Sequence, residues 1–81
     1  MSSVERKQKK SGGTLGQRVY AQRLGKGLTQ GELAALTGLS AGHISEIENG
    51  IKENLQHKTL QKLAKGLGMS LMELLGEDDN A

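Results

Sequence analysis

Apolar residues recur along this chain with the period of an α-helix. Leu60, Leu63, Ala64 and Leu67 occupy positions i, i+3, i+4 and i+7, which form one face of a helix. Four other segments carry shorter parts of the same pattern, and none alternates apolar and polar residues as a half-buried strand would. The pattern therefore predicts an all-α fold of five helices.

Polar and glycine residues mark the ends of these helices. Three segments begin with the capping-box pattern, in which a Thr or Ser is followed three residues later by Gln or Glu: Thr14–Gln17, Thr29–Glu32 and Ser70–Glu73. Ser40 is a good N-cap, and glycine marks the stops at residues 25, 27, 38, 50 and 68. We therefore expect helices from residue 14 to about 25, over 30–37, over 41–49, over a segment that includes 60–67, and from residue 70.

The chain divides into an arm, one domain and a tail. Its 81 residues allow a single domain, which we place at residues 14–75. Residues 1–13 are polar, hold four basic residues and end in Ser-Gly-Gly, so we expect a disordered basic arm. Residues 76–81 form an acidic tail. With one Tyr and no Phe or Trp, the core has to consist of aliphatic residues.

Helical periodicity predicts which side chains face that core. The expected set is Leu15, Val19 and either Gln22 or Arg23 in the first helix, Leu33 and Ala34 with Leu36 as a further candidate in the second, Ile44 and Ile47 in the third, and Leu71, Leu74 and Leu75 in the fifth. Met72 lies off the face of the fifth helix, so it is either exposed or closes the core. We expect partial burial of His57. Five glycines inside predicted helices, at 16, 25, 31, 42 and 66, have no explanation in the pattern and each costs about 0.5–1 kcal/mol relative to alanine.

Composition excludes several classes of protein. The absence of cysteine excludes disulfides and thiolate metal sites, and two histidines without a third donor make a poor metal site. No run of 18 apolar residues and no signal peptide is present, so we expect a cytoplasmic protein that does not contact a membrane. The sequence lacks a nucleophile set and a phosphate loop, which predicts no enzyme activity, no cofactor and no small-molecule substrate. A net charge of +2 with a basic arm suits a polyanionic partner.

The segment 28–50 resembles the phage repressor/Cro (Xre-like) helix-turn-helix family. The resemblance is carried by Thr29-Gln30, Leu33-Ala34, Gly38-x-Ser40 and Ile44-x-x-Ile47-Glu48-x-Gly50, and it covers about residues 14–75. Asn54-Leu55 also resembles restriction-modification controller proteins. The resemblance implies that the second and third predicted helices form a DNA-binding unit and that the third lies in the major groove. It also implies a structural ion pair between Arg23 and Glu48.

The resemblance assigns a DNA-contact role to twelve residues. Thr29 and Gln30 begin the second helix and would hold a backbone phosphate. Base edges would face Ser40, Ala41, Gly42, Ser45 and Glu46, with His43 beside them. The loop after the third helix would run along the sugar-phosphate backbone of the DNA, which would be contacted by Asn49, Lys52, Asn54 and Lys58.

The base-facing residues are unusually poor readers of sequence. Ala41 offers only a methyl contact to thymine, and Gly42 offers only close approach. Glu46 either accepts from cytosine or repels DNA, and His43 either contacts phosphate or fills surface. We therefore expect specificity to depend on DNA shape, water or the arm.

These features predict a sequence-specific, DNA-binding transcriptional regulator of a prokaryote or phage. The family usually binds as a homodimer, and the fifth helix with Met69, Leu71, Met72 and Leu75 is the expected contact between copies. The alternative is an antitoxin or adaptor module that binds DNA weakly and acts through a protein partner. The weakness of Ala41 and Gly42 as base readers favours this alternative slightly.

Overall fold

The computed structural model describes residues 14–52 and 54–76. Over this range the chain forms five helices and no strand: α1 (Leu15–Gly25), α2 (Gln30–Thr37), α3 (Ala41–Glu48), α4 (His57–Leu67) and α5 (Leu71–Leu75). The predicted all-α class is confirmed. The basic arm predicted over residues 1–13 lies outside the described residues, as does the acidic tail beyond residue 76.

Each predicted cap is present. Thr14, Thr29 and Ser70 accept a hydrogen bond from the backbone N–H three residues on, and the Gln or Glu at that position accepts from the N–H of the cap. Ser40 Oγ accepts from the N–H of His43 at 3.0 Å. These bonds satisfy N–H groups that a helix start leaves without partners, so the starts of α1, α2, α3 and α5 follow from local sequence alone.

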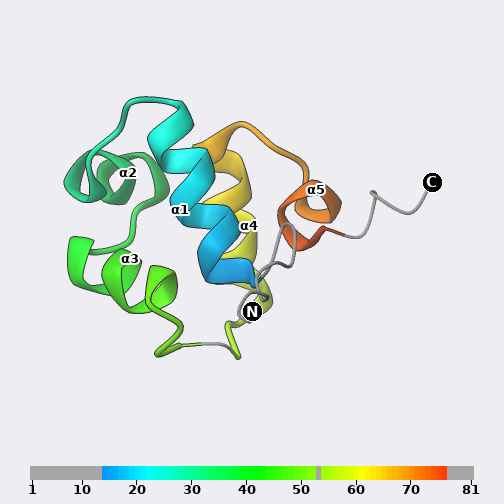
Figure 1. Cartoon of the computed structure of the whole chain (residues 1–81). Coiled ribbons are helices and arrows are strands. Elements are labelled where there is room, and N and C mark those ends of the chain that lie inside the picture. The colour runs from blue at the N-terminus through cyan, green and yellow to red at the C-terminus, as the bar shows by residue number, and fades with distance from the viewer. Residues whose placement is uncertain (1–13, 53, 77–81) are drawn as a thin grey trace, which may run out of the picture.

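The helices pack around α1 in two groups (Figure 1). α2 and α3 lie together on one side and α5 lies on the other, with α4 alongside α1 between them. α3 packs against α1 and α2, α2 also contacts α4, and α5 covers both α1 and α4. The third helix is thus supported from behind by α1 and α2, and none of the other described helices covers its outer side.

One aliphatic core joins all five helices. Its fully buried side chains are Val19, Leu33, Ile44, Ile47, Leu63, Leu67 and Leu74. Arg23 is buried and Gln22 is exposed, which settles that alternative. Leu36 and Met72 are 58% and 56% exposed, so neither completes the core. The expectation for His57 is wrong, because it is the exposed first residue of α4 and precedes the turn that meets the core.

Two helical glycines allow backbones to approach closely. A Cβ atom at Gly16 would overlap the carbonyl oxygen of Ile47, and one at Gly66 would press on Thr37 Cγ2. These two positions explain part of the glycine excess that the sequence pattern left open. A Cβ at Gly25, by contrast, would meet nothing within 4 Å.

Candidate nucleic-acid interface

A tight turn sets the angle between α2 and α3. Gly38 adopts φ +78°, a left-handed conformation that costs glycine little, and its N–H donates to the carbonyl of Ala34 at 2.8 Å. The N–H of Leu39 donates to the same carbonyl at 3.2 Å. Ser40 then caps α3. Three residues, 38–40, therefore connect α2 to α3.

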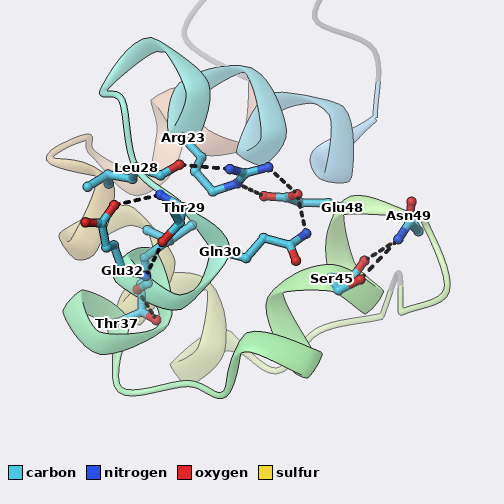
Figure 2. A network of polar contacts seen from close by, with 10 residues as sticks. Arg23, Leu28, Thr29, Gln30, Glu32, Thr37, Ser45, Glu48 and Asn49 are labelled. Carbon is cyan, nitrogen blue, oxygen red and sulfur yellow. Dashed lines mark hydrogen bonds and ion pairs between the residues drawn. The ribbon is translucent and has the colours of Figure 1, made fainter.

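A buried polar network connects α1, α2 and α3 (Figure 2). The guanidinium of Arg23 donates from Nε to Glu48 Oε2 at 2.7 Å and from Nη2 to Glu48 Oε1 at 3.1 Å. Its Nη1 donates to the carbonyl of Leu28 at 2.8 Å. Gln30 Nε2 donates to Glu48 Oε1 at 3.0 Å. The ion pair that the resemblance implied is therefore present, and Gln30 joins it.

The environment of Arg23 favours its charged form. The hydrogen bond to Glu48 is the main cause that raises the pKa of the guanidinium, and burial opposes it. The Arg23 Cζ atom also lies 5.4 Å from the centroid of the Tyr20 ring, which adds a cation–π contact. The side chains of Arg23 and Glu48 are only 9% and 4% exposed, so this pair is shielded from solvent.

The first turn of α3 presents almost no side chain to a partner. Ser40, Ala41 and Gly42 are exposed, and the Ser40 hydroxyl oxygen already accepts from His43 N–H. His43 and Glu46 are half-buried. The exposed part of this turn therefore offers almost no side-chain donor or acceptor to another molecule.

Ser45 and Asn49 are linked at the end of α3. Asn49 Nδ2 donates to the Ser45 carbonyl at 2.9 Å and lies 3.3 Å from Ser45 Oγ (Figure 2). Asn49 Nδ2 thus bonds to its own helix in the unbound chain. A phosphate contact from Asn49 remains a prediction. The Ser45 hydroxyl accepts, which leaves its hydrogen free to donate.

The loop after α3 exposes basic and polar side chains. Gly50 has φ +78°, and Ile51 N–H donates back to the carbonyl of Glu46 at 2.9 Å. Lys52, Asn54 and Lys58 are all exposed. Gln56, the N-cap of α4, makes no side-chain capping bond, so the first N–H groups of α4 are open to an anion beside Lys58.

Other kinds of site find little support in the described part of the chain. No group of three or more His, Asp or Glu side chains there could hold a metal ion. No helix among the described residues is both long and apolar enough to cross a membrane. An open pocket of about 190 Å³ lies between the start of α1 and the end of α3, below the roughly 300–1,000 Å³ of most ligand sites.

The uncovered third helix, the tight turn and the buried Arg–Glu pair behind it define a helix-turn-helix protein. The chain belongs to the helix-turn-helix family, which it matches over residues 19–74. The predicted resemblance is therefore confirmed.

Known relatives agree with this assignment. The HTH-type transcriptional regulator SinR of Bacillus licheniformis is 34% identical over 65 residues, which are 80% of this chain and 59% of that protein. This chain therefore spans less than two thirds of that relative.

Two solved structures are also similar. The restriction-modification controller protein C.AhdI from Aeromonas hydrophila has a TM-score of 0.71 and 36% identity, with 75% of this chain and 91% of that chain covered. The P22 c2 repressor, solved with a synthetic operator, has a TM-score of 0.72 and 31% identity, with 80% and 97% covered. Both kinds of protein that the sequence resembles, phage repressors and controller proteins, are thus among its structural neighbours.

Proposed function

We propose that this chain is a sequence-specific, DNA-binding regulator of transcription that places α3 in the major groove. The observation that carries the proposal is the uncovered outer side of α3, fixed from behind by the Arg23–Glu48 pair. The likeness to the P22 c2 repressor, which was solved on operator DNA, supports it. A major groove is wide enough for one helix and displays a distinct pattern for each base pair.

Phosphate contacts would flank the third helix. Thr29 and Gln30 at the start of α2 would bind one phosphate strand, where the helix dipole favours an anion. Lys52, Asn54 and Lys58 would follow a second stretch of backbone. All of these side chains except the half-buried Gln30 are exposed. Such contacts give affinity and register, and they carry no sequence information.

Direct base readout would be sparse. Ser45 has a hydroxyl hydrogen to donate, Glu46 is the one side chain of the set that accepts strongly from cytosine, and Ala41 offers a methyl group to thymine. Gly42 and Ser40 would let the start of α3 approach the base edges, with His43 at the side. Sequence-dependent DNA shape would then supply much of the specificity.

A second copy of the chain would complete the operator complex. Met72 is 56% exposed on α5 and is flanked by the partly buried Met69, Leu71 and Leu75. Contact through this surface would place two α3 helices on half-sites about 34 Å apart, one turn of DNA. We infer a weak dimer that becomes stable on DNA.

A protein-interaction module of the antitoxin or adaptor kind is the second candidate. Tyr20 and Leu24 are 49% and 51% exposed and lie one turn apart on α1, where they form an exposed apolar pair. This pair and the side-chain-poor start of α3 favour a protein partner. Neither candidate involves catalysis, and both place the protein in the cytoplasm.

Fluorescence anisotropy tests the two candidates directly. The chain is titrated onto a duplex from upstream of its own gene and onto a scrambled duplex of the same composition, across a salt series. A preference for the upstream duplex that persists at moderate salt supports the regulator. Equal and salt-labile binding to both would contradict sequence-specific recognition, and stable co-purification with another protein would then favour the module.

A further inference from the structure

Glu48 connects the start of α2 to the buried pair behind α3. Its Oε1 accepts from Gln30 Nε2 at 3.0 Å and from Arg23 Nη2 at 3.1 Å, and its Oε2 accepts from Arg23 Nε at 2.7 Å. Arg23 is itself anchored by the carbonyl of Leu28 at 2.8 Å. Because the guanidinium holds both carboxylate oxygens, the carboxylate has one orientation, and the side chain of Gln30 lies against it (Figure 2).

This contact fixes the orientation of the Gln30 amide. An ionised carboxylate only accepts hydrogen bonds, so the NH2 group of Gln30 has to face Glu48 and its carbonyl oxygen has to face away. The amide nitrogen carries two hydrogens, of which Glu48 takes one. The second hydrogen is available to a phosphate oxygen, and the half-buried side chain does not need to rotate to offer it.

We propose that Glu48 is a positioning residue for DNA binding that acts through Gln30. The proposal rests on the proposed function and adds a mechanism to it. A free glutamine loses its rotamer freedom when it binds a phosphate, whereas Gln30 has already lost it on folding. Release of Gln30 from Glu48 should therefore weaken DNA binding by about tenfold, the size of effect expected from the rotamer entropy of one long side chain.

A double-mutant cycle separates this role from a structural one. Glu48→Gln places an NH2 group in the network, where its one carbonyl oxygen cannot replace both acceptors. Affinity is measured for a scrambled duplex at low salt, because phosphate contacts do not depend on sequence. We expect Glu48→Gln to weaken binding about tenfold in the unaltered background and less than twofold in a Gln30→Met background.

The controls cover folding and position. Circular dichroism and urea unfolding are used to check that each variant is folded at the temperature of the titration. Gln61→Met, a change of the same kind at an exposed residue of α4, should leave the affinity unchanged. Equal losses from Glu48→Gln in both backgrounds, or no loss in either, would overturn the positioning role. Failure of the unaltered chain to bind any duplex would instead overturn the proposed function.

The mobility of the Gln30 side chain can be measured on the unaltered chain, so this test does not depend on whether a variant folds. Side-chain amide relaxation by NMR, without DNA, should give Gln30 an order parameter of about 0.8 or higher, near that of rigid backbone. Gln61 should stay below about 0.6. A Gln30 amide as mobile as that of Gln61 would show that Glu48 does not hold it, and the inference would fail whatever the chain does with DNA.

Discussion

Gly16 in α1 lies directly against the carbonyl oxygen of Ile47 in α3, at a distance that leaves no room for a Cβ atom. The carbonyl oxygen of Glu48 lies only 3.0 Å from the same Cβ position. Because both neighbours are backbone atoms of a packed helix, they cannot move aside as a flexible side chain would. This contact sets the separation between α1 and the end of the third helix.

Gly16→Ala should therefore destabilise the protein although alanine is the better helix former. We expect a loss of about 2–3 kcal/mol in the free energy of unfolding, since overpacking forces a backbone shift. Urea unfolding measures it. The matched control is Gly25→Ala, where a Cβ meets open space and stability should stay equal or rise by up to about 1 kcal/mol. Equal effects of the two substitutions would contradict the close packing of α1 on α3.

Gly66→Ala should lower the free energy of unfolding through a steric clash that a second substitution, at Thr37, can relieve. The added Cβ would meet Thr37 Cγ2 in α2. Thr37→Ser deletes that methyl group but keeps the hydroxyl, which donates to the carbonyls of Leu33 and Ala34. The double variant should be more stable than the sum of the single effects predicts, by about 1 kcal/mol. Additive losses in thermal unfolding would show that Thr37 is not the obstacle.

Arg23→Met should come close to unfolding the domain. It leaves the carboxylate of Glu48, 4% exposed, without its partner, and the loss of one member of a buried pair costs about 3–5 kcal/mol. That is a large part of the roughly 5–15 kcal/mol of a typical domain. Circular dichroism during urea unfolding provides the measurement. Lys65→Met, at an exposed residue of α4, is the control and should change stability by less than about 0.5 kcal/mol.

Lys52→Gln should reduce the salt dependence of DNA binding. If Lys52 neutralises one phosphate, the slope of log K against log salt should become shallower by about 0.9, with the preference between duplexes unchanged. Anisotropy titrations at several salt concentrations give the slope. Lys65→Gln should leave it as it is. If the sequence preference changed and the slope did not, Lys52 would contact bases and not a phosphate.

Met72→Lys should weaken assembly on DNA without weakening the fold. The side chain is 56% exposed and lies outside the buried core, so its replacement should change little packing in the single chain and would place a charge in the proposed contact between copies. We expect loss of cooperative binding to a two-half-site duplex, measured by analytical ultracentrifugation with DNA, and an unchanged unfolding midpoint. Retained cooperativity would place the contact between copies elsewhere on the surface.

Local sequence determined where α1, α2, α3 and α5 start and which turn joins α2 to α3. Each cap, at Thr14, Thr29, Ser40 and Ser70, binds a backbone N–H only three residues away. The left-handed turn at Gly38 depends only on the glycine itself, because a residue without a Cβ atom adopts a positive φ at little cost. Helical periodicity also identified most of the core, because facing side chains repeat every three to four residues. The family motif named the members of the candidate interface.

Only the tertiary structure decided how residues far apart in sequence meet. The hydrogen bond from Gln30 to Glu48 and the difference between the crowded Gly16 and the open Gly25 both depend on the approach of separate helices. The exposure of His57 likewise follows from where the start of α4 lies. Periodicity gives the direction of a side chain around its own helix axis, but the distance between two axes is set by the packing of all five helices at once.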